Sequence, residues 1–321
     1  MLSKERVQCV IEGKAPDKIP VYGWLKENLK DVISAKYGSV EQFEDKYEFD
    51  FAHLFGGPGC FNREQFTALK KSCNGEITPE SLLSLDMADV NDHTKYENVK
   101  KAIEHHKEKR GRFVYIQTPG IFEANNDYFG IQNHLMFLAL YPEELKLVYE
   151  RQAKWNRQFA LNCIDLGVDM IHVSDDWGAQ NSLLFSPDTW WELIYPYHKI
   201  TVDAVKQTGT YVSLHSDGNI TQVLDGIVKL GYDVIHPYQE SAGMSYDLYH
   251  RKYKDHFALM GGLDVQTTIG FGKLEHLKSE IERIIGLFKS GHLLFCTSHF
   301  VQAHCTLEEL EFAYDLILSI R

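Results

Sequence analysis

Histidine, aspartate and cysteine, the side chains that most often hold metal ions or move protons, follow several apolar segments of this sequence. In the stretch YVSLHSDGN, residues 211–219, an apolar run ends in His215 and Asp217. Because side chains alternate along a strand with a period of two, these two residues are predicted to point to the same side. A histidine nitrogen and a carboxylate oxygen are both ligands of zinc. The sequence therefore predicts a metal site at the end of this strand.

Each of these residues also has a structural interpretation. Asp217 can hydrogen-bond the backbone of the Gly-Asn turn that follows it, while His215 stays metal-free in a polar pocket. Asp175 or Asp264, taken alone, can cap the helix after its strand. Convergence of several such residues on one place would favour chemistry over these structural roles.

The elements that must position them are short apolar strands alternating with helices. The predicted strands are IPVYGW (19–24), FDFAHLFG (49–56), RFVYIQTP (112–119), VDMIHVSDD (168–176), TYVSLHSD (210–217), YDVIHPY (232–238), FALMGGLD (257–264) and HLLFCTSH (292–299). Eight strands favour an α/β fold of the (β/α)8 TIM-barrel type over a doubly wound sheet, since no GxGxxG turn follows the first strand. We expect one domain over residues 1–321, with N-terminal helical decoration and extra helix in 57–111.

In such a barrel the loops after the carboxyl ends of the strands carry the chemistry, so the strand ends supply the candidate residues. The predicted catalytic residues are Asp175, Asp176 and His215. The predicted substrate-binding residues are Trp24, Gln117, Trp177, Tyr238 and Asp264. The predicted metal ligands are His215, Asp217, Glu240, Cys296 and His299.

Cys296 and His299 are alternatives for one ligand position. They lie three residues apart, so strand alternation turns only one of them inward unless the strand has ended by His299. We favour His299 if the chain has entered the loop at that point, and Cys296 otherwise.

Composition narrows the class of partner. The chain has 33 Lys and Arg against 45 Asp and Glu, and a net charge of −12 disfavours nucleic acid and anionic membranes as partners. Its N-terminus lacks a signal-peptide core, and no apolar stretch has the length of a membrane span. The six cysteines form no CxxC pair. We expect a cytoplasmic protein with reduced thiols.

The segment VDMIHVSDDWGAQNSLLFSPDTWWELIYPYHKITVDAVKQTGTYVSLHSDGNI resembles the uroporphyrinogen decarboxylase superfamily, which also contains the cobalamin-linked methyltransferases of anaerobes. GIFEANNDYFG, GGLDVQTT and CTSHFVQ extend the likeness over residues 110–320. Members of this superfamily are (β/α)8 barrels, which agrees with the strand count.

The resemblance implies different sites for the two branches. The decarboxylases carry an arginine-rich, RQAGRY-like segment that binds substrate carboxylates, whereas IPVYGWLKENLKD offers only Lys26 and Lys30. The methyltransferases often hold zinc with His-x-Cys before a glycine and a further cysteine near the last strand. His215 matches that pattern and Asp217 stands in place of its cysteine, a departure that disfavours a thiolate-rich site and is compatible with a harder His/Asp/Glu site.

The leading hypothesis is a methyltransferase that exchanges a methyl group between a small donor, such as a methoxylated aromatic, and a corrinoid carried by a partner protein. Zinc would act as a Lewis acid on the donor. Trp24, Trp177 and Tyr238 line the donor pocket or belong to the core.

One alternative is a decarboxylase of a porphyrinogen or smaller carboxylated ring, with Asp175 or Asp176 stabilising a protonated intermediate. Another is a non-catalytic barrel that binds a tetrapyrrole or corrinoid.

Overall fold

The computed structural model describes residues 1–25 and 28–321, so Lys26 lies outside the described residues. Contacts divide the chain into two compact units. The first unit comprises Met1–His53, His106–Val114 and Asp233–Arg321, and the second comprises Leu54–His105 and Tyr115–Tyr232. A single domain over the whole chain stays a prediction.

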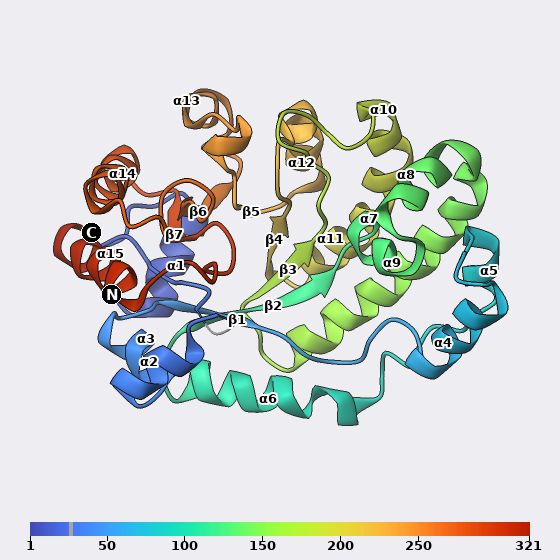
Figure 1. The fold of residues 1–321 in the computed structure, drawn as a ribbon, viewed down its shortest axis with the longest axis horizontal. Helices are drawn as coiled ribbons and strands as arrows, with labels where there is room; N and C mark the ends of the chain where they lie inside the picture. The colour runs from blue at the N-terminus through green and yellow to red at the C-terminus, as the bar shows by residue number, and fades with distance from the viewer. Residues whose placement is uncertain (26–27) are drawn as a thin grey trace. The chain divides into compact units, whose positions relative to one another are not determined.

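The second unit is built on three strands that lie side by side in Figure 1. These are β2 (Phe113–Pro119, in this unit from Tyr115), β3 (Met170–Ser174) and β4 (Tyr211–His215). They pair in parallel, and Gln117, His172 and Ser213 lie in register. Residues in register share one face of a sheet, as do residues two positions further on, so this face also carries Ser174 and His215.

Apolar residues alternate with these polar ones. Ile171, Val173, Val212 and Leu214 are all buried. The helices α9 (Pro142–Asp165) and α11 (Tyr195–Gln207) pack on β3 and β4 and on each other. This sheet therefore has an apolar face that helices cover and a polar face that is free to carry a site.

The other helices of the second unit follow the predicted alternation. They are α4 (Arg63–Ser72), α5 (Pro79–Leu83), α6 (Glu97–Ile103), α7 (Phe122–Phe129), α8 (Ile131–Leu140), α10 (Pro187–Thr189) and α12 (Leu224–Leu230). The predicted extra helix in 57–111 corresponds to α4, α5 and α6. Helix α9 begins at Pro142, where proline's missing N–H costs no hydrogen bond.

The first unit contains the remaining strands. They are β1 (Phe51–Leu54, in this unit to His53), β5 (Val234–His236), β6 (Ala258–Leu263) and β7 (Leu293–Thr297). β5, β6 and β7 pair in parallel in chain order. Its helices are α1 (Ser3–Ile11), α2 (Lys30–Tyr37), α3 (Val40–Lys46), α13 (Tyr246–Leu248), α14 (Leu274–Leu287) and α15 (Leu307–Ile320).

Seven of the eight predicted strands are present in the described residues, and the segment 19–24 forms only a single parallel bridge, from Val21 to Phe295. Side chains take the donors that a longer ladder would need. The Val21 N–H donates to Oδ2 of Asp50 at 3.0 Å, and the Trp24 N–H donates to Oγ1 of Thr297 at 3.2 Å. Pro20 has no N–H to donate. Among the described residues, backbone pairing with β7 is limited to the Tyr22 N–H on the Phe295 carbonyl at 3.0 Å and the Phe295 N–H on the Pro20 carbonyl at 2.9 Å.

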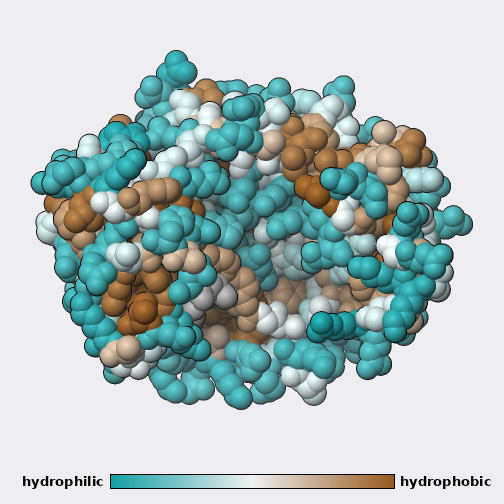
Figure 2. All heavy atoms as spheres, viewed as in Figure 1, coloured by the Kyte–Doolittle hydropathy of each residue, from teal (hydrophilic) through white to brown (hydrophobic). Residues whose placement is uncertain are grey.

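Hydrophilic residues dominate the face of the molecule drawn in Figure 2, with hydrophobic residues in separate patches. Over residues 1–25 and 28–321, no helix combines the length and the apolar character needed to cross a bilayer.

A buried carboxylate joins the two ends of the chain within the first unit. Asp50 is 1% exposed and accepts hydrogen bonds from the guanidinium groups of Arg6 and Arg321. Ser3 Oγ also donates to it, at 2.9 Å. Charged groups buried this deeply need partners. The positions of α1 and of the end of α15 therefore depend on the side chain of Asp50.

We expect Asp50→Ala to lower the free energy of unfolding by about 3–5 kcal/mol, because it leaves buried guanidinium groups without their buried partner. Urea unfolding followed by circular dichroism measures this. The control is Asp203→Ala, which removes only an exposed pair with Lys199 and should leave the midpoint nearly unchanged. A wild-type midpoint for Asp50→Ala would contradict the structural role.

Candidate functional site

His215 lies at the end of β4 with two carboxylates beside the same ring nitrogen. Its Nε2 is 3.6 Å from Oδ1 of Asp176 and 3.8 Å from Oδ1 of Asp217. The Asp217 N–H donates to Oδ1 of Asp176 at 2.8 Å. The imidazole is 5% exposed, whereas the carboxylates are 33% and 34% exposed. The cluster thus joins a buried imidazole to two partly exposed carboxylate side chains.

Two glycines allow the loops that carry these carboxylates to meet. A Cβ atom on Gly178 would lie 2.4 Å from the Asp217 carbonyl oxygen. Gly218 has φ +77°, and a Cβ atom there would lie 2.5 Å from the Gly178 carbonyl carbon. Only glycine fits both positions, so backbone packing holds Asp176 next to Asp217.

The neighbouring Asp175 is fully buried and engaged with backbone. Its carboxylate accepts the N–H groups of Ile121 at 3.0 Å, Phe122 at 3.2 Å and Glu123 at 2.6 Å, at the start of α7. It also accepts from Nε2 of His198 on α11 at 2.7 Å. A negative charge at a helix N-terminus is favourable, so Asp175 anchors α7 to the end of β3.

The ionisation of Asp175 follows from these contacts. Burial opposes the charged form, but the hydrogen bond and charge of His198 and the N–H of Glu123 outweigh it, so the pKa of Asp175 lies below its usual value. Gly120 makes the close approach possible, since a Cβ atom there would lie 2.4 Å from Cβ of Asp175.

Glu123, in the first turn of α7, is a site residue that the sequence analysis did not single out. Ser174 Oγ donates to its Oε2 at 2.9 Å. Burial, with the charges of Asp176 and Asp175, raises the pKa of Glu123 to about 8. The side chain is therefore mostly protonated at neutral pH. The available signal was a carboxylate directly after a strand and turn, in the segment GIFEANNDYFG.

Burial also favours the neutral form of His215. It lowers the pKa of the imidazole, and the charge of Asp176 only partly opposes this. The adjacent His172 lies with Nδ1 2.7 Å from Ser213 Oγ, and its ring is 5.9 Å from that of His215. Neutral imidazole is the form that binds metals.

The donor set fits a divalent ion such as zinc. Ligand atoms about 2.0–2.1 Å from a tetrahedral zinc are about 3.3 Å from each other. The distances from His215 Nε2 to the two carboxylates, 3.6 Å and 3.8 Å, are slightly longer than this. Small side-chain rotations would bring the His215 nitrogen and one of these carboxylate oxygens onto one ion.

Comparison with known proteins assigns the family. Residues 75–318, more than half of the chain, match the family uroporphyrinogen decarboxylase (URO-D). The chain belongs to the uroporphyrinogen decarboxylase family. This confirms the resemblance seen in the sequence.

A solved methyltransferase structure shares the fold of this family member at low identity. A methyltransferase from Methanosarcina mazei is similar with a TM-score of 0.76 and 15% identity, over 99% of both chains. A B12-independent methionine synthase from Shewanella has a TM-score of 0.46 and 15% identity, over 68% of this chain and 64% of the other. No curated protein matches the sequence.

Two further predicted residues of this family member lie in the second unit. Gln117 is on β2, in register with His172 on the polar face. Trp177 is fully buried, 5.4 Å from the ring of Trp190 and 4.9 Å from that of His198. Trp177 therefore occupies a core position.

In the first unit, an aromatic cluster surrounds Trp24. Its ring is 4.9 Å from those of His53 and His236 and 5.7 Å from that of His299. β7 ends at Thr297, so His299 lies in the following loop, the condition under which it was favoured over Cys296.

Cys296 instead lies inside β7, close to Tyr314, and burial raises the pKa of its thiol.

The remaining predicted residues of the first unit follow β5 and β6. Tyr238 donates its hydroxyl to the Ser245 carbonyl at 3.1 Å, Glu240 pairs with Arg283 at 2.6 Å, and Asp264 accepts from Ser241 Oγ at 2.5 Å. Metal binding by Glu240, Cys296 and His299 stays a prediction.

Glu123→Gln should change how stability depends on pH. Between pH 4.5 and about 8 the folded chain holds a proton on Glu123 that the unfolded chain has released, so this group's contribution to stability is lost as pH rises through that range. Wild type should therefore lose stability relative to Glu123→Gln from pH 5 to 8 in urea unfolding. Glu150→Gln, which alters an exposed pair with Lys154, is the control. Parallel pH profiles for wild type and Glu123→Gln would show that the raised pKa is wrong.

Proposed function

We propose that this family member is a methyltransferase that moves a methyl group between a small donor, such as a methoxylated aromatic, and a corrinoid carried by a partner protein. The observation that carries the proposal is His215 with the carboxylates of Asp176 and Asp217 at its Nε2. Family membership and the fold shared with the Methanosarcina mazei methyltransferase support this class. The proposed fold is a (β/α)8 barrel in which Pro20–Tyr22 takes the place of the eighth strand.

In this proposal His215 and Asp217 hold zinc, and Asp176 lies beside His215. A bound zinc ion supplies Lewis-acid activation of the atom that carries the methyl group. His215 is suited to this role because burial keeps its imidazole neutral. The partly exposed carboxylate of Asp176 gives a donor molecule access to the cluster.

Glu123 holds a proton that the demethylated donor can use. At neutral pH its carboxyl group is mostly protonated, and Ser174 fixes one of its oxygens. A carboxylic acid in this state can hydrogen-bond or protonate a leaving oxygen, sulfur or nitrogen. Asp175 acts as a positioning residue, because it holds the start of α7 in place. Such positioning matters for a displacement, which needs donor and acceptor in line.

A decarboxylase is the second candidate, favoured by the family match itself. The half-exposed carboxylate of Asp176 would then stabilise a protonated pyrrole-like intermediate. Release of carbon dioxide from uroporphyrinogen without added metal would support this function over methyl transfer. A barrel that only binds a tetrapyrrole or corrinoid would show affinity and neither reaction.

His215→Ala should abolish both bound zinc and methylcobalt formation, because it removes the nitrogen ligand. Untagged protein is analysed for metal and then mixed with methyl donors and reduced corrinoid, with the cobalt spectrum as readout. His276→Ala, an exposed position on α14, should keep both properties. Stoichiometric zinc and full activity in folded His215→Ala would refute the metal site.

A further inference from the structure

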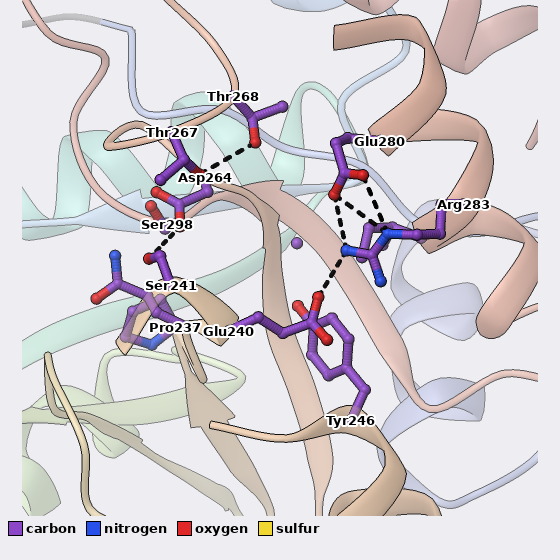
Figure 3. Close-up of a pocket in the computed structure, with 13 residues that line it drawn as sticks. Pro237, Glu240, Ser241, Tyr246, Asp264, Thr267, Thr268, Glu280, Arg283 and Ser298 are labelled. Carbon is purple, nitrogen blue, oxygen red and sulfur yellow. Dashed lines mark hydrogen bonds and ion pairs between the residues drawn. The ribbon is translucent and has the colours of Figure 1, made fainter. Parts of the chain in front are cut away.

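A cavity of about 470 Å³ lies within the first unit, at the carboxyl ends of β5, β6 and β7. Its size is within the range of small-molecule sites. Figure 3 shows Arg283 with Glu240 and Glu280 on one side, and Asp264 with Ser241 on the other.

The charged groups make the cavity unfavourable for anions. The Arg283 guanidinium contacts Glu240 Oε2 at 2.6 Å and Glu280 Oε2 at 2.7 Å. Two carboxylates therefore already compensate its one positive charge. Asp264 adds a third carboxylate, so the lining carries an excess of negative charge that favours a cationic ligand.

A buried amide faces the cavity without a protein partner. Gln239 lines the cavity and is 6% exposed, and its side chain hydrogen-bonds no residue in the described part of the chain. Buried polar groups are nearly always hydrogen-bonded, and an amide offers two donors and an acceptor. Gln239 is thus available to a ligand group that both donates and accepts, such as a hydroxyl.

Hydroxyl groups and an aromatic ring also line the cavity. The hydroxyls of Ser241, Thr267 and Ser298 border the cavity, and Ser241 donates to Asp264 Oδ2. Tyr246 is buried and contributes an aromatic surface. Hydroxyls, an amide and carboxylates next to an aromatic ring match a compact polar molecule with hydroxyl groups and a positive charge.

We propose that this cavity binds a small hydroxylated amine, of the class of amino sugars and amino alcohols. Gln239 and the Ser and Thr hydroxyls bind the ligand hydroxyls, and Asp264 and Glu240 attract the ammonium group. A binding measurement tests this proposal without any assay of methyl transfer.

Three probes of nearly equal size separate charge from shape: glucosamine, glucose and glucuronate. Titration of the full chain by calorimetry should give the order glucosamine, glucose, glucuronate, with about a tenfold difference in Kd between the first and the last. Glucuronate binding as tightly as glucosamine, or no binding of any probe at millimolar concentration, would overturn the proposal.

Variants place the binding in this cavity. Gln239→Leu keeps the side-chain size and removes the amide, and should weaken glucosamine binding about tenfold. Ser241→Ala is a milder second variant in case Gln239→Leu does not fold, which thermal unfolding checks. Glu275→Gln, exposed on α14 and outside the cavity, should bind as wild type does. Unchanged binding in folded Gln239→Leu or Ser241→Ala would exclude this cavity as the site.

Discussion

The buried carboxylate of Asp175 is the interaction on which the candidate site depends. It accepts three backbone N–H groups at the start of α7 and the imidazole of His198 on α11. A buried charge is stable only when such partners replace its water. The end of β3, the start of α7 and α11 are therefore held together at one point. Glu123 and Asp176, immediately beside these contacts, are placed by them.

Burial then sets the protonation of the groups around this anchor. It raises the pKa of Glu123 and lowers that of His215, so both side chains favour their neutral forms near neutral pH. A neutral imidazole can bind a metal, and a neutral carboxyl group can give up a proton. In the cavity of the first unit, by contrast, the charge of Arg283 is compensated by two carboxylates, those of Glu240 and Glu280.

Strand positions were predictable because apolar runs of this length are distinctive, and seven of the eight occur in the described residues. The exception, residues 19–24, has the composition of a strand but forms only a short bridge to Phe295. The N–H groups of Val21 and Trp24 bind the side chains of Asp50 and Thr297, residues distant in the sequence. No local pattern could have shown this competition.

The sequence by itself determined the family, the strand–helix alternation and the pairing of His215 with Asp217 at one strand end, because periodicity and motifs are local properties. Only the tertiary structure decided which carboxylates are exposed. Asp175 and Asp176 are adjacent in the chain, yet one is buried against backbone and the other is open beside His215. Glu123 belongs to the candidate site because folding places it next to Ser174 and Asp175. Burial and hydrogen-bond partners depend on residues brought together by folding, and those contacts are what set the charge of each group.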